Sequence, residues 1–165
     1  MPLTPPDPPA GTSWRSLMDV AFAQACMAAK EGESPIGAAL FAPDGALLAA
    51  ARNNPVGLND PTAHAEVLCL RQAAARLGNY RLTGTILAVT LEPCLMCTGA
   101  LIHARVAGVV MGALDPRAGA VISNLQGHAL PFANHRMWFV QGVMEEECST
   151  LLKRFFLEKR RGCTR

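Results

Sequence analysis

The sequence is poor in charged residues: only 17% of its 165 residues are Asp, Glu, Lys or Arg, and the formal net charge is +2. Because half of the residues are apolar, this composition argues against a disordered chain and favours a well-filled core. A net charge so small also means that any nucleic-acid partner must be recognised by locally placed positive charge. The length suits one domain, which would bury roughly 70% of the surface of its unfolded form.

Signals that would direct the chain into or across a membrane are missing as well. No run of eighteen apolar residues occurs, and the N-terminus lacks the charged and apolar regions of an export signal. Apart from Cys94 and Cys97, the cysteines show no framework of pairs, and Cys26, Cys69 and Cys148 are interpreted as small apolar filler on helices. These absences predict a cytoplasmic protein without a membrane partner.

Five prolines crowd the start of the chain, which predicts a disordered, solvated arm over 1–13, ahead of a single domain over 14–161 and a short tail over 162–165. Irregular segments are expected over 52–61 and 115–136. Alternating helices and strands that begin with a hairpin predict a three-layer α/β/α domain around a mixed five-stranded sheet. The apolar periodicity predicts helices over 14–30, 61–77, 93–104 and 144–161, and strands over 36–42, 46–51, 85–91, 106–112 and 137–143.

The most informative pattern is the cysteine pair Cys94 and Cys97, which follows Pro93 and opens a predicted helix directly after an apolar strand. With His64 upstream, the pair supplies three ligands of a half-open zinc site, whose fourth tetrahedral position can hold a water. Two other interpretations of Cys-x-x-Cys are a redox pair and one half of a four-ligand structural site. A redox pair needs no His64, and a four-ligand site needs a second Cys or His pair that the sequence does not supply at suitable spacing. The pattern therefore favours one catalytic zinc ion per chain.

Glu66 is the predicted proton carrier of this site. It follows His64 by two residues, too close along one helical turn to be a second ligand, yet able to reach the metal-bound water. Zinc lowers the pKa of that water from about 15.7 to roughly 7, so a neighbouring carboxylate can accept its proton. Both residues are expected in the first turns of helix 61–77, where the positive end of the helix dipole points toward the site.

A family resemblance rests on these motifs. His64-Ala65-Glu66 together with Pro93-Cys94-Leu95-Met96-Cys97 matches the signature of zinc-dependent nucleobase deaminases. The stretches 59–66, 79–82 and 90–94 more specifically resemble the bacterial tRNA-specific adenosine deaminases, and the resemblance covers all but the two ends of the chain. It implies a cytidine deaminase-like fold and hydrolytic deamination of adenosine to inosine at the wobble position of tRNA anticodons, by a zinc-bound hydroxide.

The same resemblance implies a set of roles. Glu66 would pass the water proton to purine N1 and later help to protonate the departing amine. Asn53 would contact the flipped purine with Pro55 beside it, although an Asx-type turn is the alternative for Asn53. Asp115 would lie near the RNA backbone, and loop capping is its alternative role. Phe156 would belong to the RNA-binding region, and simple core packing is its alternative role. The basic residues that would meet phosphates, unless merely solvated, are Lys159, Arg160 and Arg161.

The charge at the C-terminal end favours an anionic partner. From position 153 onward the sequence carries six Lys or Arg residues against Glu158 alone, so six minus one gives a local charge of +5. The loop 116–123 departs from many family members, which have Lys-Thr-Gly followed by a Gly-Ser step. The remaining histidines, His103, His128 and His135, lack ligand spacing to the site, and we assign them no catalytic role.

Three classes of function are compatible with such a zinc site. The first is an RNA-editing enzyme, which acts on the tRNA anticodon loop. The second is a deaminase of free purine or pyrimidine bases or nucleosides, which needs no basic final helix. The third is a non-catalytic partner subunit, which would lack the glutamate that Glu66 supplies. The resemblance also implies a homodimer, for which Leu101 and Ile102 are the interface candidates.

Overall fold

The five strands form one mixed sheet in the order β2-β1-β3-β4-β5 within residues 3–162, the part of the chain that the computed structural model describes. Strand β1 pairs antiparallel with β2 and β3, whereas β3, β4 and β5 run parallel. The mixed sheet predicted from the initial hairpin is therefore confirmed. The bounds are β1 (Gly37–Phe41), β2 (Leu47–Arg52), β3 (Ile86–Leu91), β4 (Gly108–Ala113) and β5 (Trp138–Val140).

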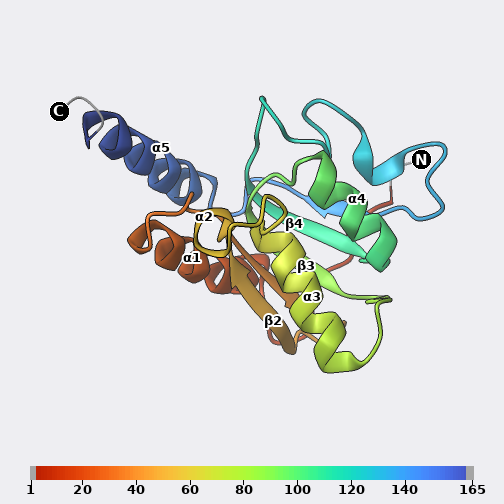
Figure 1. Ribbon diagram of the computed structural model, residues 1–165. Coiled ribbons are helices and arrows are strands. Elements are labelled where there is room, and N and C mark those ends of the chain that lie inside the picture. Colours follow the sequence, from red (N-terminus) through yellow and green to blue (C-terminus); the bar gives the residue numbers. More distant parts are fainter. Residues whose placement is uncertain (1–2, 163–165) are drawn as a thin grey trace.

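Helices cover both faces of this sheet and complete the predicted three layers (Figure 1). Helices α3 and α4 lie side by side on one face, and α1 and the start of α5 pack on the other. The far half of α5 projects from the body, with its side chains exposed beyond Phe155. None of the helices within 3–162 is long and apolar enough to cross a membrane. The bounds are α1 (Trp14–Lys30), α2 (Pro55–Leu58), α3 (Ala65–Leu77), α4 (Leu95–Ala104), the 3₁₀ helix η1 (Gly127–Ala129) and α5 (Glu145–Gly162).

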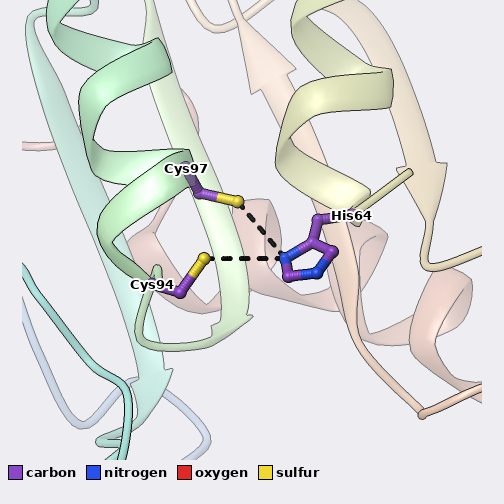
Figure 2. Close-up of side chains that lie close together, drawn as sticks. All are labelled: His64, Cys94 and Cys97. Atoms are coloured by element: carbon purple, nitrogen blue, oxygen red, sulfur yellow. Dashed lines mark hydrogen bonds between the residues drawn. The ribbon is translucent and has the colours of Figure 1, made fainter. Parts of the chain in front are cut away.

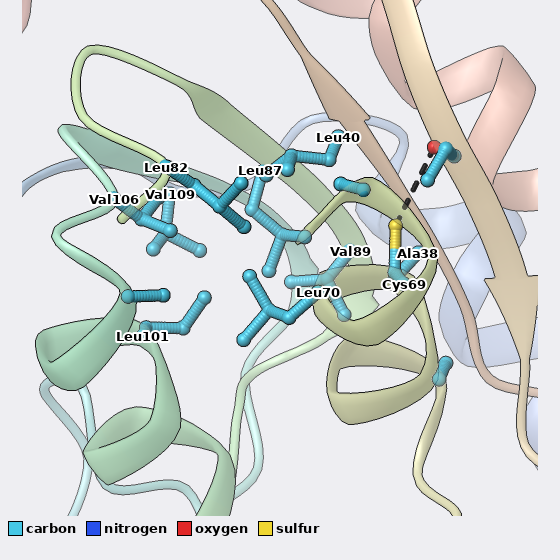
Figure 3. Close-up of a cluster of buried hydrophobic side chains, with 14 of the residues drawn as sticks. Ala38, Leu40, Cys69, Leu70, Leu82, Leu87, Val89, Leu101, Val106 and Val109 are labelled. Carbon is cyan, nitrogen blue, oxygen red and sulfur yellow. Dashed lines mark hydrogen bonds between the residues drawn. The ribbon is translucent and has the colours of Figure 1, made fainter. Parts of the chain in front are cut away.

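The core is divided by the sheet into two clusters, as the alternation of side chains along a strand requires. In β1, Ala38 and Leu40 belong to the cluster beneath α3 and α4, while Ala39 and Phe41 belong to the cluster beneath α1. Figure 3 shows the first cluster, in which aliphatic side chains of the strands meet those of α3 and α4. Cys69 lies in this cluster as predicted filler, with its thiol donating to a backbone carbonyl.

Two helices begin later than the sequence periodicity predicts. Helix α3 begins at Ala65 rather than at 61, because Asp60 caps a tight turn instead of the helix: its carboxylate accepts from the backbone N–H and hydroxyl of Thr62 at 2.8 and 2.7 Å. Helix α4 begins at Leu95 rather than at 93. The expected loop 52–61 also contains one helical turn, α2, opened by Pro55 at its first position.

The proline-rich segment before α1 has no helix or strand between residues 3 and 13. Its first residues are exposed, but Pro9 is buried, and Thr12 donates both its backbone N–H and its hydroxyl to the carbonyl of Pro9. Ser13 caps α1 through its side chain, as predicted. The disorder of 1–13 and the domain boundary at residue 14 stay predictions, and of the tail 162–165 only Gly162 lies inside the described residues.

The register of the parallel strands determines where the site forms. Leu91 at the end of β3 pairs with Ala113 at the end of β4. Because parallel strands end at the same edge of a sheet, the segments that follow them meet there. The Cys94 segment and the segment that begins at Asp115 are therefore neighbours, although about twenty residues separate them in the sequence.

Candidate metal centre and active site

The predicted ligands come from the starts of two neighbouring helices. His64 occupies the N-cap position of α3, and Cys94 occupies the N-cap position of α4. Both have extended backbone, and neither side chain caps its own helix. Cys97 lies in the first turn of α4. The two cap side chains therefore point away from their own helices, and Figure 2 shows them converging with Cys97 on the space between α3 and α4.

The distances among the ligand atoms match a tetrahedral zinc site. His64 Nδ1 lies 3.6 Å from Cys94 Sγ and 3.5 Å from Cys97 Sγ, and all three ligand atoms lie within 4.8 Å of one another. Zinc bonds of ordinary length to nitrogen and sulfur at a tetrahedral angle place those atoms about 3.6 Å apart. No second group of three such side chains comes as close within residues 3–162. These residues therefore fit one zinc ion, as the sequence predicted.

The two thiols differ in their affinity for the proton. Because the Cys97 thiol donates a hydrogen bond to it, and in spite of partial burial, the pKa of Cys94 is lowered to about 5. The pKa of Cys97 is raised, because its proton is held by Cys94 and because the thiol is buried. Zinc is bound by thiolates, so metal binding must release the proton that Cys97 holds.

Glu66 lies beside the ligands, in the first turn of α3, with only 3% of its surface exposed. Burial raises the pKa of this carboxyl above its ordinary value, although a backbone hydrogen bond opposes the shift. The Cys97 thiol is hydrogen-bonded to it. A buried carboxyl whose pKa is raised above its ordinary value holds a proton more readily, and a general acid–base catalyst must both accept a proton and return it.

Asn53 supports the histidine from the end of β2. Its side-chain oxygen accepts from the backbone N–H of Ala65 at 2.8 Å, and the side chain is buried. The neighbouring backbone N–H of Asn54 donates to the carbonyl of Ala63. Asn53 is therefore not in the Asx turn that was its alternative interpretation, because its partner lies twelve residues away. It fixes the start of α3, next to His64, while Pro55 opens α2 in the same loop.

Of the residues predicted to contact RNA, Phe156 and Arg160 line one cleft, and the loop on the other side of that cleft forms a bridge with Cys94 through Gly119. Asp115 accepts from the backbone N–H of Arg117 at 3.0 Å, which is the loop-capping role given as its alternative. Phe156 is 45% exposed, whereas its neighbour Phe155 is buried, so core packing describes Phe155 and not Phe156. A cleft of about 430 Å³ lies between the loop and α5, lined by Arg117, Leu152, Lys153, Phe156, Leu157 and Arg160.

Lys159 lies elsewhere. Its ammonium donates to the carbonyl of Gly32 at 2.9 Å, at the end of α1, and lies 5.2 Å from the centre of the Phe155 ring. The structure therefore assigns Lys159 a contact that holds α5 against α1, and it does not line the cleft. The histidines without an assigned role behave as expected where contacts are defined: ring nitrogens of His128 and His135 donate to backbone carbonyls of Val121 and Val106.

Two residues of the site were missed by the sequence interpretation. Arg117 lines the cleft, and the only local signal for it was a positive charge in the segment that departs from the family pattern. Glu92 is buried and accepts four hydrogen bonds from the loop that follows β4. Burial raises the pKa of Glu92, but these donors outweigh it and hold the pKa below its ordinary value. No residue pattern near Glu92 could have revealed partners more than twenty positions away.

Three soft ligands with a buried carboxyl beside them define the site of a zinc-dependent deaminase. Comparison with known proteins agrees: residues 12–113 match the family model described as the cytidine and deoxycytidylate deaminase zinc-binding region. The chain belongs to this family of zinc-dependent deaminases, in the branch of the tRNA-specific adenosine deaminases.

Two relatives from that branch and one deaminase of another specificity illustrate the similarity. A tRNA-specific adenosine deaminase from Agrobacterium fabrum is 42% identical over 144 residues, which cover 87% of this chain and 94% of the relative. A solved tRNA:A34 deaminase, studied for A-to-I editing at the wobble position, has a TM-score of 0.80 and 40% identity over 83% of this chain and 99% of its own. A solved guanine deaminase from Bacillus subtilis has a TM-score of 0.60 and 39% identity over 62% of this chain and 66% of its own.

Proposed function

We propose that this enzyme hydrolyses adenosine to inosine at the wobble position of tRNA anticodons. The observation that carries the proposal is the joint presence of the His64, Cys94 and Cys97 cluster and a basic cleft with one exposed aromatic ring, connected to the cluster by the loop that bridges to Cys94. The relatives named above that act on tRNA support the choice of substrate. A single-stranded anticodon loop is where extruding one base costs least, so a site at the protein surface can reach it.

The chemistry follows from the arrangement of the side chains. His64, Cys94 and Cys97 would hold zinc, which supplies the Lewis acidity that makes water a nucleophile near neutral pH. Glu66 accepts the proton of the attacking water and delivers it to purine N1, so that C6 can accept the oxygen. Collapse of the tetrahedral carbon releases the amine, which Glu66 helps to protonate so that it leaves as ammonia. Asn53 and Pro55 would form the wall that contacts the extruded purine.

The cleft supplies the contact to the flanking nucleotides. Its exposed ring, Phe156, can stack with a base, while Arg117, Lys153 and Arg160 can meet phosphates. Lys159 contributes only indirectly, through its contact with Gly32.

Replacing Phe156 by alanine is expected to raise the KM for a tRNA anticodon stem-loop about 5- to 160-fold, since a base–aromatic stack contributes about 1–3 kcal/mol. The kcat and the melting temperature should change little, because nearly half of the residue is exposed and it lies outside the ligand cluster. Leu77→Ala is a matched control, because it removes an equally exposed apolar side chain from the far end of α3. An unchanged KM in the Phe156 variant would exclude this ring from RNA binding.

The substrate itself is tested by comparing RNA with free bases. Sequencing of total tRNA treated with the pure protein should show inosine at position 34 of an anticodon. Ammonia release from guanine, cytosine and their nucleosides should stay at background. The similarity to a guanine deaminase makes this comparison the decisive one. Rapid release of ammonia from a free base, without editing of tRNA, would favour a deaminase of free bases or nucleosides. The presence of Glu66 argues against a non-catalytic subunit.

We further propose that two copies form a homodimer. Leu101 cannot serve the interface as predicted, because it is fully buried within one chain. Ile102 is largely buried too, but it borders an exposed apolar groove of about 460 Å³ between α4 and the segment 125–134. Leu95 and Phe132 are the most exposed apolar side chains of this groove, Phe132 at 84%. Such an apolar patch is a typical surface for self-association.

Phe132→Asp is expected to convert a dimer of twice 17.5 kDa into a monomer, because a charge at the centre of an apolar interface is costly to bury. Light scattering at micromolar concentration measures the mass. Leu47→Asp places the same charge on an exposed apolar position of β2, at the other edge of the sheet, and should leave the dimer intact. A monomeric wild-type protein would refute the homodimer.

A cytoplasmic location is also proposed. The five cysteines within the described residues are free thiols, and two of them must remain reduced to hold zinc. A reducing compartment preserves them in that state.

A further inference from the structure

The carboxylate of Glu92 is saturated by donors from one loop. Oε1 accepts the backbone N–H groups of Ile122 and Ser123, each at 2.9 Å. Oε2 accepts the backbone N–H of Asp115 at 3.1 Å and the hydroxyl of Ser123. Only 2% of the Glu92 surface is exposed. A buried ion with four charge-assisted hydrogen bonds fixes the positions of its donors more firmly than neutral contacts do.

The same loop is attached to the segment that carries the metal ligand. The backbone N–H of Ala120 donates to the carbonyl of Pro93 at 2.9 Å, and Gly119 forms an antiparallel bridge with Cys94. There is no room for a side chain at this point: a Cβ on Gly119 would lie 2.2 Å from Glu92 Oε2 and 2.5 Å from the carbonyl of Asp115. Loop and ligand segment are thus packed directly together.

Arg117, in the outer part of this loop, reaches the cleft in which we place the RNA. Arg117 lines the cleft opposite Phe156 of α5. Glu92 itself neither lines that cleft nor belongs to the ligand cluster. It stands two residues from Cys94 and binds both ends of the loop, at Asp115 and at Ser123. Together with the backbone contacts of Gly119 and Ala120, this carboxylate holds the loop that carries Arg117 against the Cys94 segment.

We propose that Glu92 is a positioning residue, which holds the loop 115–123 against the Cys94 segment so that Arg117 is in place in the cleft to bind RNA. The proposal rests on the proposed function, because it assigns the loop to the RNA substrate.

Glu92→Gln is the direct test. An amide has nearly the same shape, but its NH₂ group faces two backbone N–H donors at the Oε1 position and that of Asp115 at the Oε2 position, where the Ser123 hydroxyl can turn and accept. At least one of the four hydrogen bonds is therefore lost and becomes repulsive, and the negative charge that strengthens the others is removed. We expect the KM for a tRNA anticodon stem-loop to rise at least tenfold, with kcat within about threefold of wild type and one zinc ion per chain by elemental analysis. This separation of KM from kcat is the signature of lost substrate binding.

Two further variants keep the test independent of folding. Ser123→Ala removes only the hydroxyl donor and should raise KM by a few fold, which gives a graded series with Glu92→Gln. Thr85→Val removes a buried hydrogen bond at the opposite end of β3, where the hydroxyl donates to the carbonyl of Leu82 at 2.6 Å. This variant also loses a buried hydrogen bond but does not touch the loop, so its KM should equal that of wild type.

The Arg117→Ala variant tests whether Glu92 acts on the cleft through the loop. If Glu92 acts by placing Arg117, the Glu92→Gln change should raise KM far less in an Arg117→Ala background than in wild type. Loss of zinc from Glu92→Gln, or a fall in kcat at unchanged KM, would assign the carboxylate to the metal segment and overturn the proposal. A wild-type enzyme without activity on tRNA would instead refute the proposed function, so the two failures are distinguishable.

Discussion

Glu66→Ala is expected to lower kcat for inosine formation by about 100- to 10,000-fold, the usual contribution of a positioned acid–base group. The carboxyl is buried beside the ligand atoms, and it is the only proposed acceptor for the proton of the attacking water. Zinc content should remain at one ion per chain, because Glu66 is not one of the ligands. The measurement is a single-turnover assay on a tRNA stem-loop, which reports the chemical step without product release.

Glu66→Gln is the matched variant for this experiment. Glutamine keeps the volume and the burial of the side chain but cannot transfer a proton, so its kcat should fall as far as that of the alanine variant. Similar values for the two variants exclude an effect of the cavity that alanine leaves. A variant that retains zinc and stays within about threefold of the wild-type rate would remove Glu66 from its catalytic role.

The layers and the sheet could be predicted because they depend on local periodicity. Apolar residues at helical spacing predicted α1 with its correct bounds, and the run after Thr85 predicted the buried strand β3. The starts of α3 and α4 were predicted too early, since both Asp60 and Pro93 are typical of helix starts. In the structure, Asp60 instead binds Thr62 and makes a separate turn, so His64 is extended.

The later starts of α3 and α4 matter for the chemistry, because they make His64 and Cys94 the N-cap residues of the two helices. An N-cap residue has extended backbone, and its side chain ordinarily bonds to its own helix. At His64 and Cys94 no such bond forms, so each side chain reaches across to the neighbouring helix. Motif spacing predicted which residues would bind zinc but not this geometry, which depends on the packing of α3 against α4.

Contacts between distant segments were the part that the sequence could not provide. The loop after β4 was considered only as a departure from the family pattern, yet Glu92 binds it at both ends. Lys159 was grouped with its basic neighbours, yet it contacts Gly32 across the helix pair. Both results follow from the pairing of β3 with β4 and of α1 with α5, which a one-dimensional pattern does not specify.

Removing the metal ligands is expected to abolish activity altogether. In Cys94→Ala and His64→Ala one of three ligands is lost, and the two that remain bind zinc too weakly to keep it through purification. Elemental analysis should show less than about a tenth of an ion per chain, and inosine formation should fall at least 1,000-fold. Cys69→Ala is the control, because this buried thiol lies in the core and not in the cluster, so its zinc content should be unchanged.

The same ligands join α3 to α4, so metal removal should also lower the melting temperature. A ligand present at 1,000 times its dissociation constant stabilises the native state by about 4 kcal/mol, and this contribution disappears when a chelator removes the ion. Wild-type protein treated with a chelator and desalted should therefore melt earlier and regain both stability and activity on addition of zinc. Cys94→Ala should show neither response, because zinc can stabilise the fold only where His64, Cys94 and Cys97 are all present. Full activity after exhaustive chelation would contradict a metal-dependent reaction, and restored activity in Cys94→Ala would contradict this ligand set.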